Sequence, residues 1–296
     1  MPAKIAGDGD FIMLPFDFNV PSTTPNLDNT QPWENLPYAN IVKGKNIKVI
    51  NAEQIPENIH KIKTIRPWGW DFAIKKYLCE HGCSKNLLPT DLQLEYIRNL
   101  SHRKTTIPFR KTIYEELETP PKKLGKEIFS LEELECFLAS NQIAFFKAPW
   151  SSSGRGVVHS SHISRNGLLE WAHGILRKQH SLIAEPVWEK ALDFASEWEV
   201  RNQVPIFLGY SVFEASERGK YHKNIEASQP DLYKIINKAA PSFSNRIIKA
   251  QEVALSKHIS PFYEGPLGID MLVDKYGEIN PCVEINLRLT MGHIML

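Results

Sequence analysis

One stretch near the end of the chain decides the fold: Gly265-Pro-Leu-Gly-Ile-Asp270-Met-Leu-Val-Asp-Lys-Tyr-Gly277-Glu-Ile-Asn-Pro-Cys-Val-Glu284-Ile-Asn286-Leu-Arg288. Apolar segments 267–273 and 279–285 flank a turn that contains Gly277, which predicts a β-hairpin. Asp270 on one strand can then face Glu284 and Asn286, which share a face because side chains two apart on a strand point the same way. Carboxylate and amide oxygens are hard ligands, and carboxylates buried together need a cation, so the hairpin predicts a magnesium site. The alternative is an edge hairpin whose acidic side chains face solvent.

Arg288 continues the alternation after Asn286. Its guanidinium stays charged and binds carboxylate or phosphate in a two-pronged geometry. A cation beside the expected metal ligands therefore favours a ligand site over a solvated edge.

A second informative stretch follows an apolar segment and reads Ala144-Phe-Phe-Lys147-Ala-Pro-Trp-Ser151-Ser-Ser153-Gly154-Arg155-Gly156. Lys147 ends the apolar strand, where its ammonium needs a partner such as a nucleotide phosphate; the alternative is a lysine that reaches out to water. The loop after it has phosphate donors in its serine hydroxyls, glycine amides and arginine. It lacks the Gly-Lys-Ser/Thr ending of a P-loop, and its small residues would let it close as a lid.

A third stretch, Leu182-Ile-Ala-Glu185-Pro-Val187-Trp188-Glu189, is an apolar strand followed by a segment with free backbone groups. Pro186 removes one donor there and stiffens the segment. Taken in order, these three stretches resemble the ATP-grasp superfamily over roughly residues 129–288. The resemblance implies that Lys147 and the loop bind phosphates and that the hairpin closes the metal site.

The resemblance also implies an adenine site. The backbone between Glu185 and Trp188, through Val187, would hydrogen-bond the adenine edge, and Glu189 or Asp193 would accept from the ribose hydroxyls. Ordinary solvated charge is the alternative for those two acidic residues.

An upstream cation that contacts phosphate is also expected from the resemblance, and we favour Lys104 over Arg103 and Lys111. Arg201 and Lys223 are further cationic candidates, although a charge on a solvated strand face explains them equally well.

The predicted fold class is α/β and α+β. Strands at 11–15 and 47–50 alternate with helices that begin after Asp71 and Thr90 and with a helix over 111–117, which indicates a small open α/β domain over residues 1–118. By resemblance this is a pre-ATP-grasp-like domain, followed by two ATP-grasp subdomains: residues 119–184 with the glycine-rich lid, and 185–296 with the metal site. Trp68 and Trp70 are packing residues or, alternatively, a substrate wall.

Composition excludes several classes of function. The 296 residues are 42% hydrophobic and carry a net charge of +1, so we expect neither nucleic-acid nor membrane partners. The first residues do not read as a secretory signal, and no stretch is long and apolar enough to cross a bilayer. Four scattered cysteines predict free thiols and a cytoplasmic protein, and a zinc site at Cys79 and Cys83 would lack a second ligand pair. The oligomeric state stays open.

The expected function is an ATP-dependent ligase with Mg²⁺, or alternatively Mn²⁺, as its cation. A small-molecule carboxylate oriented by Arg288 would attack the terminal phosphate while Lys147 and Arg155 offset its charge, and an amine would then displace phosphate from the acylphosphate. Two alternatives share the same nucleotide machinery: a kinase that phosphorylates a small-molecule hydroxyl, and a nucleotide-binding module without turnover.

Overall fold

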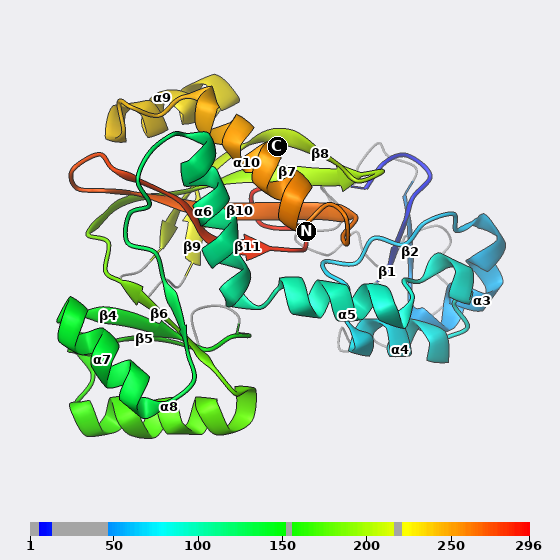
Figure 1. The fold of residues 1–296 in the computed structure, drawn as a ribbon. Helices are drawn as coiled ribbons and strands as arrows, with labels where there is room; N and C mark the ends of the chain where they lie inside the picture. The colour runs from blue at the N-terminus through cyan, green and yellow to red at the C-terminus, as the bar shows by residue number, and fades with distance from the viewer. Residues whose placement is uncertain (1–5, 14–46, 152–155, 216–220) are drawn as a thin grey trace. The chain divides into compact units, whose positions relative to one another are not determined.

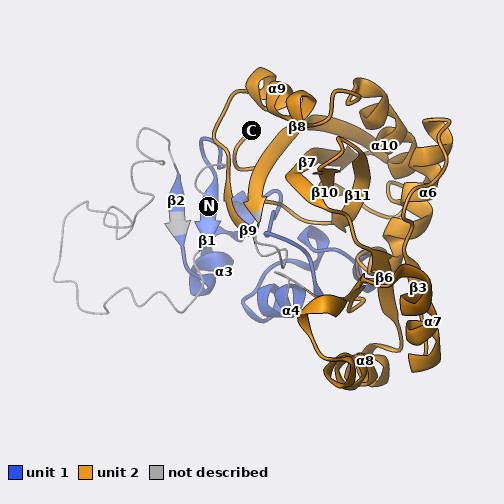
Figure 2. Ribbon diagram, turned by 90° about the vertical axis from the view of Figure 1, so that its left-hand side faces the viewer, with its two compact units in different colours: residues 1–94 blue, residues 95–296 orange. Residues whose placement is uncertain are grey.

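The computed structural model describes residues 6–13, 47–151, 156–215 and 221–296. The chain divides into two compact units, residues 1–94 and 95–296, which Figure 2 shows in different colours. Each unit has its own buried apolar core.

The first unit is a small α/β unit. Strands β1 (Phe11–Met13) and β2 (Lys48–Ile50) pair in parallel, and helices α3 (Ile55–Asn58) and α4 (Phe72–Glu80) follow them. Asp71 caps α4 as predicted, because its carboxylate accepts the backbone N–H of Ile74 at 2.8 Å. Trp70 packs partly buried against the core of this unit, whereas Trp68 is 40% exposed.

Helix α5 (Asp91–Leu100) runs across the boundary between the units and begins at the capping box that the sequence predicts. Thr90 Oγ1 accepts the backbone N–H of Gln93, whose side chain accepts the backbone N–H of Thr90 in return. Helix α6 (Thr106–Glu116) begins five residues before the predicted 111–117 helix. Pro108 is tolerated because it lies in the first turn, where backbone N–H groups need no partner within the helix.

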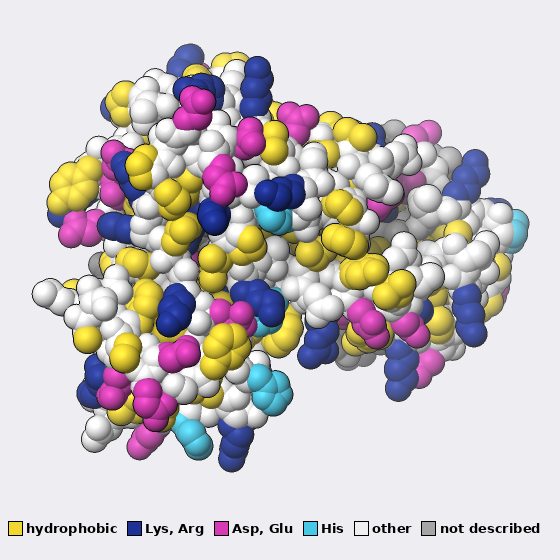
Figure 3. Space-filling view, viewed as in Figure 1, with side chains coloured by type: hydrophobic (Ala, Val, Ile, Leu, Met, Phe, Trp, Pro, Cys, Tyr) yellow, Lys and Arg dark blue, Asp and Glu magenta, His cyan; other side chains and the backbone are white. Residues whose placement is uncertain are grey.

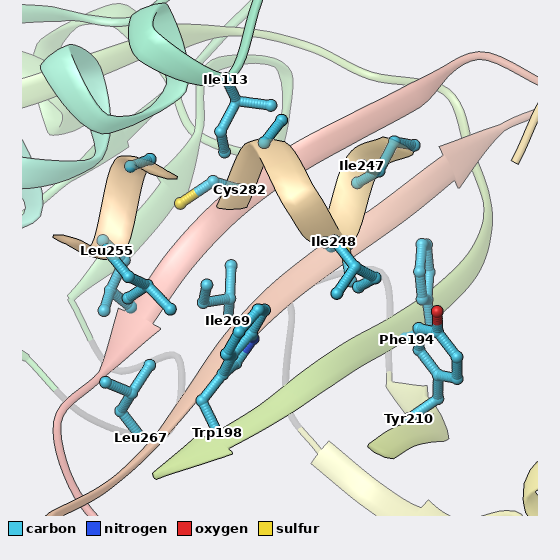
Figure 4. Close-up of a cluster of buried hydrophobic side chains, with 14 of the residues drawn as sticks. Ile113, Phe194, Trp198, Tyr210, Ile247, Ile248, Leu255, Leu267, Ile269 and Cys282 are labelled. Atoms are coloured by element: carbon cyan, nitrogen blue, oxygen red, sulfur yellow. The ribbon is translucent and has the colours of Figure 1, made fainter. Parts of the chain in front are cut away.

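The larger part of the second unit is a five-stranded antiparallel sheet in the order β11-β10-β7-β8-β9. Its strands are β7 (Lys190–Arg201), β8 (Val204–Ala215), β9 (Tyr221–Asn224), β10 (Gly265–Asp274) and β11 (Ile279–Asn286). Helices α6, α9 (Gln229–Ala239) and α10 (Asn245–His258) cover one face of it (Figure 1). Figure 4 shows the core between them, in which Ile113 of α6 and Leu255 of α10 lie over Trp198 and Ile269 of the sheet.

The smaller part of the second unit is a four-stranded antiparallel sheet in the order β3-β6-β4-β5. Its strands are β3 (Lys126–Ile128), β4 (Ala144–Lys147), β5 (Val157–His159) and β6 (Leu182–Pro186). Helices α7 (Leu131–Asn141) and α8 (Arg165–Gln179) pack against one face through a second apolar cluster. Ser130 caps α7, since its hydroxyl accepts the N–H of Glu133.

The structure is thus a mixed α and β protein with two antiparallel sheets. Helix α6 packs against α10 and β11 in the second unit. The finer division at residues 118 and 184 stays a prediction.

Side chains of both charges occur at the surface (Figure 3), and the cysteines are unpaired. Figure 3 shows acidic and basic side chains interspersed over the face it draws. All four cysteines are free thiols. Within the part of the chain that the structure describes, every helix is too short or too polar to span a membrane.

Candidate active site

Helices pack against one face of each sheet of the second unit, and Lys147, Glu185 and Asp270 alternate with residues of that packed face. In the smaller sheet, the apolar cluster under α7 and α8 includes Phe146 of β4 and Ala184 of β6. Because side chains alternate along a strand, Lys147 and Glu185 point to the opposite face. The Lys147 ammonium lies 2.5 Å from Glu185 Oε2, and both residues are buried. Lys147 therefore has an ionic partner, but that partner is a carboxylate of the chain itself, and binding of a nucleotide phosphate by Lys147 stays a prediction.

Arg110 of α6 supplies a second cation to Glu185. Its guanidinium is fully buried and lies 3.8 Å from Glu185 Oε1. It also donates to the side chain of Asn280 at 3.3 Å and to the carbonyl of Lys123 at 3.4 Å. Burial alone would raise the pKa of Glu185, but the charges of Lys147 and Arg110 outweigh burial and hold that pKa below its usual value. Glu185 is therefore a buried carboxylate between two cations.

The larger sheet carries the predicted metal ligands on the face opposite its packed helices. Asp270 of β10 lies directly opposite Glu284 of β11 in the strand register, while its neighbours Ile269 and Met271 belong to the core under the helices. The side-chain amide of Asn286 donates to Asp270 Oδ2 at 3.0 Å. The hairpin prediction and the juxtaposition of these three side chains are confirmed.

Electrostatics at Asp270 fit a divalent cation. Burial, followed by the nearby carboxylates of Glu284 and Glu197, raises the pKa of Asp270 to about 8. A hard cation would relieve this repulsion, and carboxylate and amide oxygens are the donors that Mg²⁺ prefers. Among the described residues, no group of three or more His, Cys, Asp or Glu side chains is arranged to hold a metal. A cation site here would thus depend on the asparagine as well as the two carboxylates.

Arg288 follows β11 directly and lies beside the expected ligands. Its guanidinium donates to Asn286 Oδ1 at 3.0 Å and to the carbonyl of Leu289 at 3.0 Å. Arg288 therefore orients the asparagine and, being only partly buried, retains N–H groups for a ligand.

Arg103 contacts both the base of the glycine-rich loop and the hairpin that carries the expected metal ligands. Its guanidinium donates to the carbonyl of Ala148 at 2.7 Å and to the hydroxyl of Ser151 at 2.5 Å, and on the other side to Glu284 Oε1 at 2.9 Å. Lys104, which we favoured from sequence, is exposed and 4.0 Å from Glu127. Lys111 is also exposed and pairs with Glu115 along its own helix.

The glycine-rich loop is described at its two ends only. Ala148 N–H donates to the carbonyl of Gly156 at 2.7 Å, which closes the base of the loop. A Cβ on Gly156 would come within 2.5 Å of Ser151 Cβ, so this close approach requires glycine. Ser153, Gly154 and Arg155 lie outside the described residues, and their predicted roles stay predictions.

The predicted adenine segment, Glu185 to Trp188, begins within β6 and continues beyond its end. The carbonyl of Val187 accepts the ammonium of Lys123 at 2.9 Å, and that ammonium lies 4.9 Å from the centre of the Trp188 ring. Trp188 is buried, and its indole N–H has no hydrogen-bond partner among the described residues. This leaves one buried donor at the end of the strand.

The remaining charged candidates are paired. Glu189 pairs with Lys275, and Asp193 pairs with Lys190 at 2.5 Å. Burial raises the pKa of Asp193 despite this partner. The two cationic candidates further along the chain have acidic partners on their own sheet: Arg201 with Glu199, and Lys223 with Glu214. The structure does not bring Arg201 or Lys223 into contact with Lys147 or Glu185.

Sequence reasoning missed Arg110 and Glu197. Glu197 of β7 is fully buried and accepts hydrogen bonds from Ser211 and Thr290, both at 2.7 Å, with His293 Nδ1 3.0 Å away. The feature that could have identified them is a charged residue whose neighbours on the same helix or strand are buried. Phe109 and Ile113 flank Arg110 in this way on α6.

Comparison with protein-family models and with curated proteins found no match. Solved structures with a similar fold include the biotin carboxylase domain of Hydrogenobacter thermophilus 2-oxoglutarate carboxylase, in complex with MgADP, ADP and bicarbonate (16% identity, TM-score 0.56). The alignment covers 86% of this chain and 56% of that one.

Two further structures match over 86% of this chain. Biotin carboxylase from Campylobacter jejuni, in a β-γ-ATP complex, is 15% identical with a TM-score of 0.55, over 58% of its length. N5-carboxyaminoimidazole synthetase from Staphylococcus aureus, with ADP, is 14% identical with a TM-score of 0.51, over 62% of its length. The chain thus spans less than two thirds of the proteins it matches. Identity this low bears on the fold alone, and the chain has the ATP-grasp fold of these enzymes.

Proposed function

We propose that the protein is an ATP- and Mg²⁺-dependent ligase that joins a small-molecule carboxylate to an amine through an acylphosphate. One observation carries the proposal: Arg103 donates both to Ser151, at the base of the glycine-rich loop, and to Glu284, opposite Asp270. Lys147, Arg103 and the pair of Asp270 and Glu284 lie in one compact unit and would thus contribute to one site. A polyphosphate with a bound cation has the matching charge pattern.

The phosphate side of the site would be basic. Lys147 and Arg103 are buried cations whose present partners are carboxylates and loop oxygens. Phosphate oxygens would replace those partners and form charge-assisted hydrogen bonds. Ser151 and Gly156 place the base of the loop next to Arg103, so the loop and the guanidinium would act on the same phosphates.

The metal side would use Asp270, Glu284 and Asn286. A bound Mg²⁺ supplies neutralisation of charge on the transferring phosphoryl group. Arg288, which already orients Asn286, would bind the substrate carboxylate beside it. Two structures with a similar fold support a nucleotide and metal site, since one was solved with MgADP and bicarbonate and another with ADP.

The test is release of ADP from MgATP in the presence of panels of small carboxylic acids and amines. The proposal expects ADP only when a productive acid and amine are both present. Lys147→Met should abolish turnover, whereas Lys122→Met, which removes an exposed lysine paired with Glu278 at 2.5 Å, should leave it unchanged. ADP release that needs a hydroxyl compound and no amine would overturn the ligase assignment in favour of a kinase.

Hydroxylamine separates these outcomes chemically, because an acylphosphate gives a hydroxamate and a phosphate ester does not. Binding of MgATP with no ADP released across the panel would indicate the module without turnover. In that case Glu284→Gln should still weaken nucleotide binding.

A further inference from the structure

Glu185 lies between two cations, a lysine at the end of a strand and an arginine buried on a helix. Lys147 ends β4 on a flexible four-carbon stem, whereas Arg110 lies fully buried on α6. We propose that Arg110 is a positioning residue: it acts as the permanent counter-ion of Glu185, so that Lys147 can leave Glu185 to bind nucleotide phosphate. This inference rests on the proposed function, because it concerns how the nucleotide is bound.

The geometry separates the two cations on the carboxylate. Lys147 occupies Oε2 at 2.5 Å, and Arg110 faces Oε1 at 3.8 Å. The two partners therefore do not compete for one oxygen. When Lys147 departs, Arg110 still faces the carboxylate.

Arg110 is held in place by neutral groups. Its two terminal nitrogens donate to the side chain of Asn280 and the carbonyl of Lys123. Glu185 is its one ion-pair partner among the described residues, and its Nε–H has no hydrogen-bond partner there. A buried arginine with a long ion pair and an unsatisfied N–H group contributes little to the stability of the fold. This favours an electrostatic role for Arg110 over a stabilising one.

Without Arg110, departure of Lys147 would leave a buried carboxylate with no ion-pair partner among the described residues, because Arg103 acts on Glu185 only as a weaker nearby charge. Removing one member of a buried ion pair is strongly unfavourable because the remaining charge has neither water nor a counter-charge. Lys147 would then be retained by Glu185, and the phosphates would lose a ligand. The low pKa of Glu185 agrees with a carboxylate that stays ionised between two cations.

The experiment measures binding of Mg²⁺ and a non-hydrolysable ATP analogue by calorimetry to the full chain. Arg110→Met should weaken binding by about tenfold or more, the effect of withdrawing one charge-assisted phosphate contact. The double variant Arg110→Met/Glu185→Gln should return to within about threefold of wild type, because Lys147 is released when the carboxylate is removed. Arg110→Lys, which keeps the charge, should also bind within about threefold of wild type.

The control is Arg165→Met, which removes a half-exposed arginine paired with Glu135 at 2.8 Å and should leave binding unchanged. Rescue by the second substitution distinguishes the proposal from a purely structural role, in which removing another buried polar group would not restore affinity. Equal binding by wild type and a folded Arg110→Met would overturn the inference. So would a double variant that binds no better than the single one.

If Arg110→Met does not fold, the double variant and Arg110→Lys carry the test, and a tenfold loss in either would overturn the inference. Wild-type protein that binds no nucleotide would instead overturn the proposed function, and with it this role for Arg110.

Discussion

Replacing Asp270 by asparagine should stabilise the protein when no divalent cation is present. The folded-state pKa of Asp270 is about 8, against an ordinary value of 3.8. A carboxyl group whose pKa is raised by folding binds more protons in the folded state, so stability falls as the pH rises through this window. Asparagine removes that loss and can still accept the hydrogen bond from Asn286.

The size of the effect follows from the pKa shift. At about 1.36 kcal/mol for each pKa unit, ionising Asp270 at pH 8 would cost the folded state at most about 5 kcal/mol. Because its side chain is partly exposed, solvent screening reduces our expectation to about 3 kcal/mol. Asp270→Asn should therefore match wild type near pH 4 and exceed it by about 3 kcal/mol at pH 8 in EDTA.

Calorimetric unfolding at several pH values, with EDTA or with Mg²⁺, measures this difference. Magnesium at a hundred times its dissociation constant should stabilise wild type by about 2.7 kcal/mol and leave Asp270→Asn unchanged. Asp231→Asn, which alters an exposed carboxylate on α9, is the control and should give no gain at pH 8. A variant no more stable than wild type at pH 8 in EDTA, or equal magnesium effects on both proteins, would refute the reasoning.

Three further predictions concern packing, pH and phosphate binding. Gly292→Ala should destabilise the protein by about 2–3 kcal/mol, because the new Cβ would lie 1.8 Å from a buried glutamate oxygen. Gly174→Ala, in a helix with open space around it, should instead raise the free energy of unfolding by about 0.5–1 kcal/mol. Urea unfolding of both variants measures the two changes. Burial and the charge of a neighbouring lysine lower the pKa of His258. The stability that neutral His258 contributes should therefore fall as the pH drops below 6.5, the ordinary pKa of histidine, in unfolding measured between pH 7 and 5. His258→Gln should flatten that pH dependence. Arg103→Met should weaken MgATP binding about tenfold while Lys104→Met changes it less than about threefold; the reverse order would restore the prediction made from sequence.

The metal hairpin could be predicted from sequence because its information is local. Strand alternation places Glu284 and Asn286 on one face, and the turn at Gly277 brings them to Asp270. Helix starts were equally readable, since the caps Asp71 and Thr90 lie within four residues of the groups they bind.

The upstream cation could not be chosen in this way. Arg103 and Lys104 are adjacent in sequence, and only the position of the short helix they begin decides which one points inward. The partner of Lys147 was likewise hidden, because Glu185 comes from a strand 38 positions further on and was read as part of the adenine segment. Arg110 shows the same limit: its charge matters through a residue that sequence spacing does not connect to it.

A crystal structure with a non-hydrolysable ATP analogue and Mg²⁺ tests the central claim most directly. The account predicts a cation held by Asp270 and Glu284, with the Lys147 ammonium moved from Glu185 to a phosphate oxygen. A nucleotide bound elsewhere, or a triphosphate seated here with no cation at those two carboxylates, would contradict it.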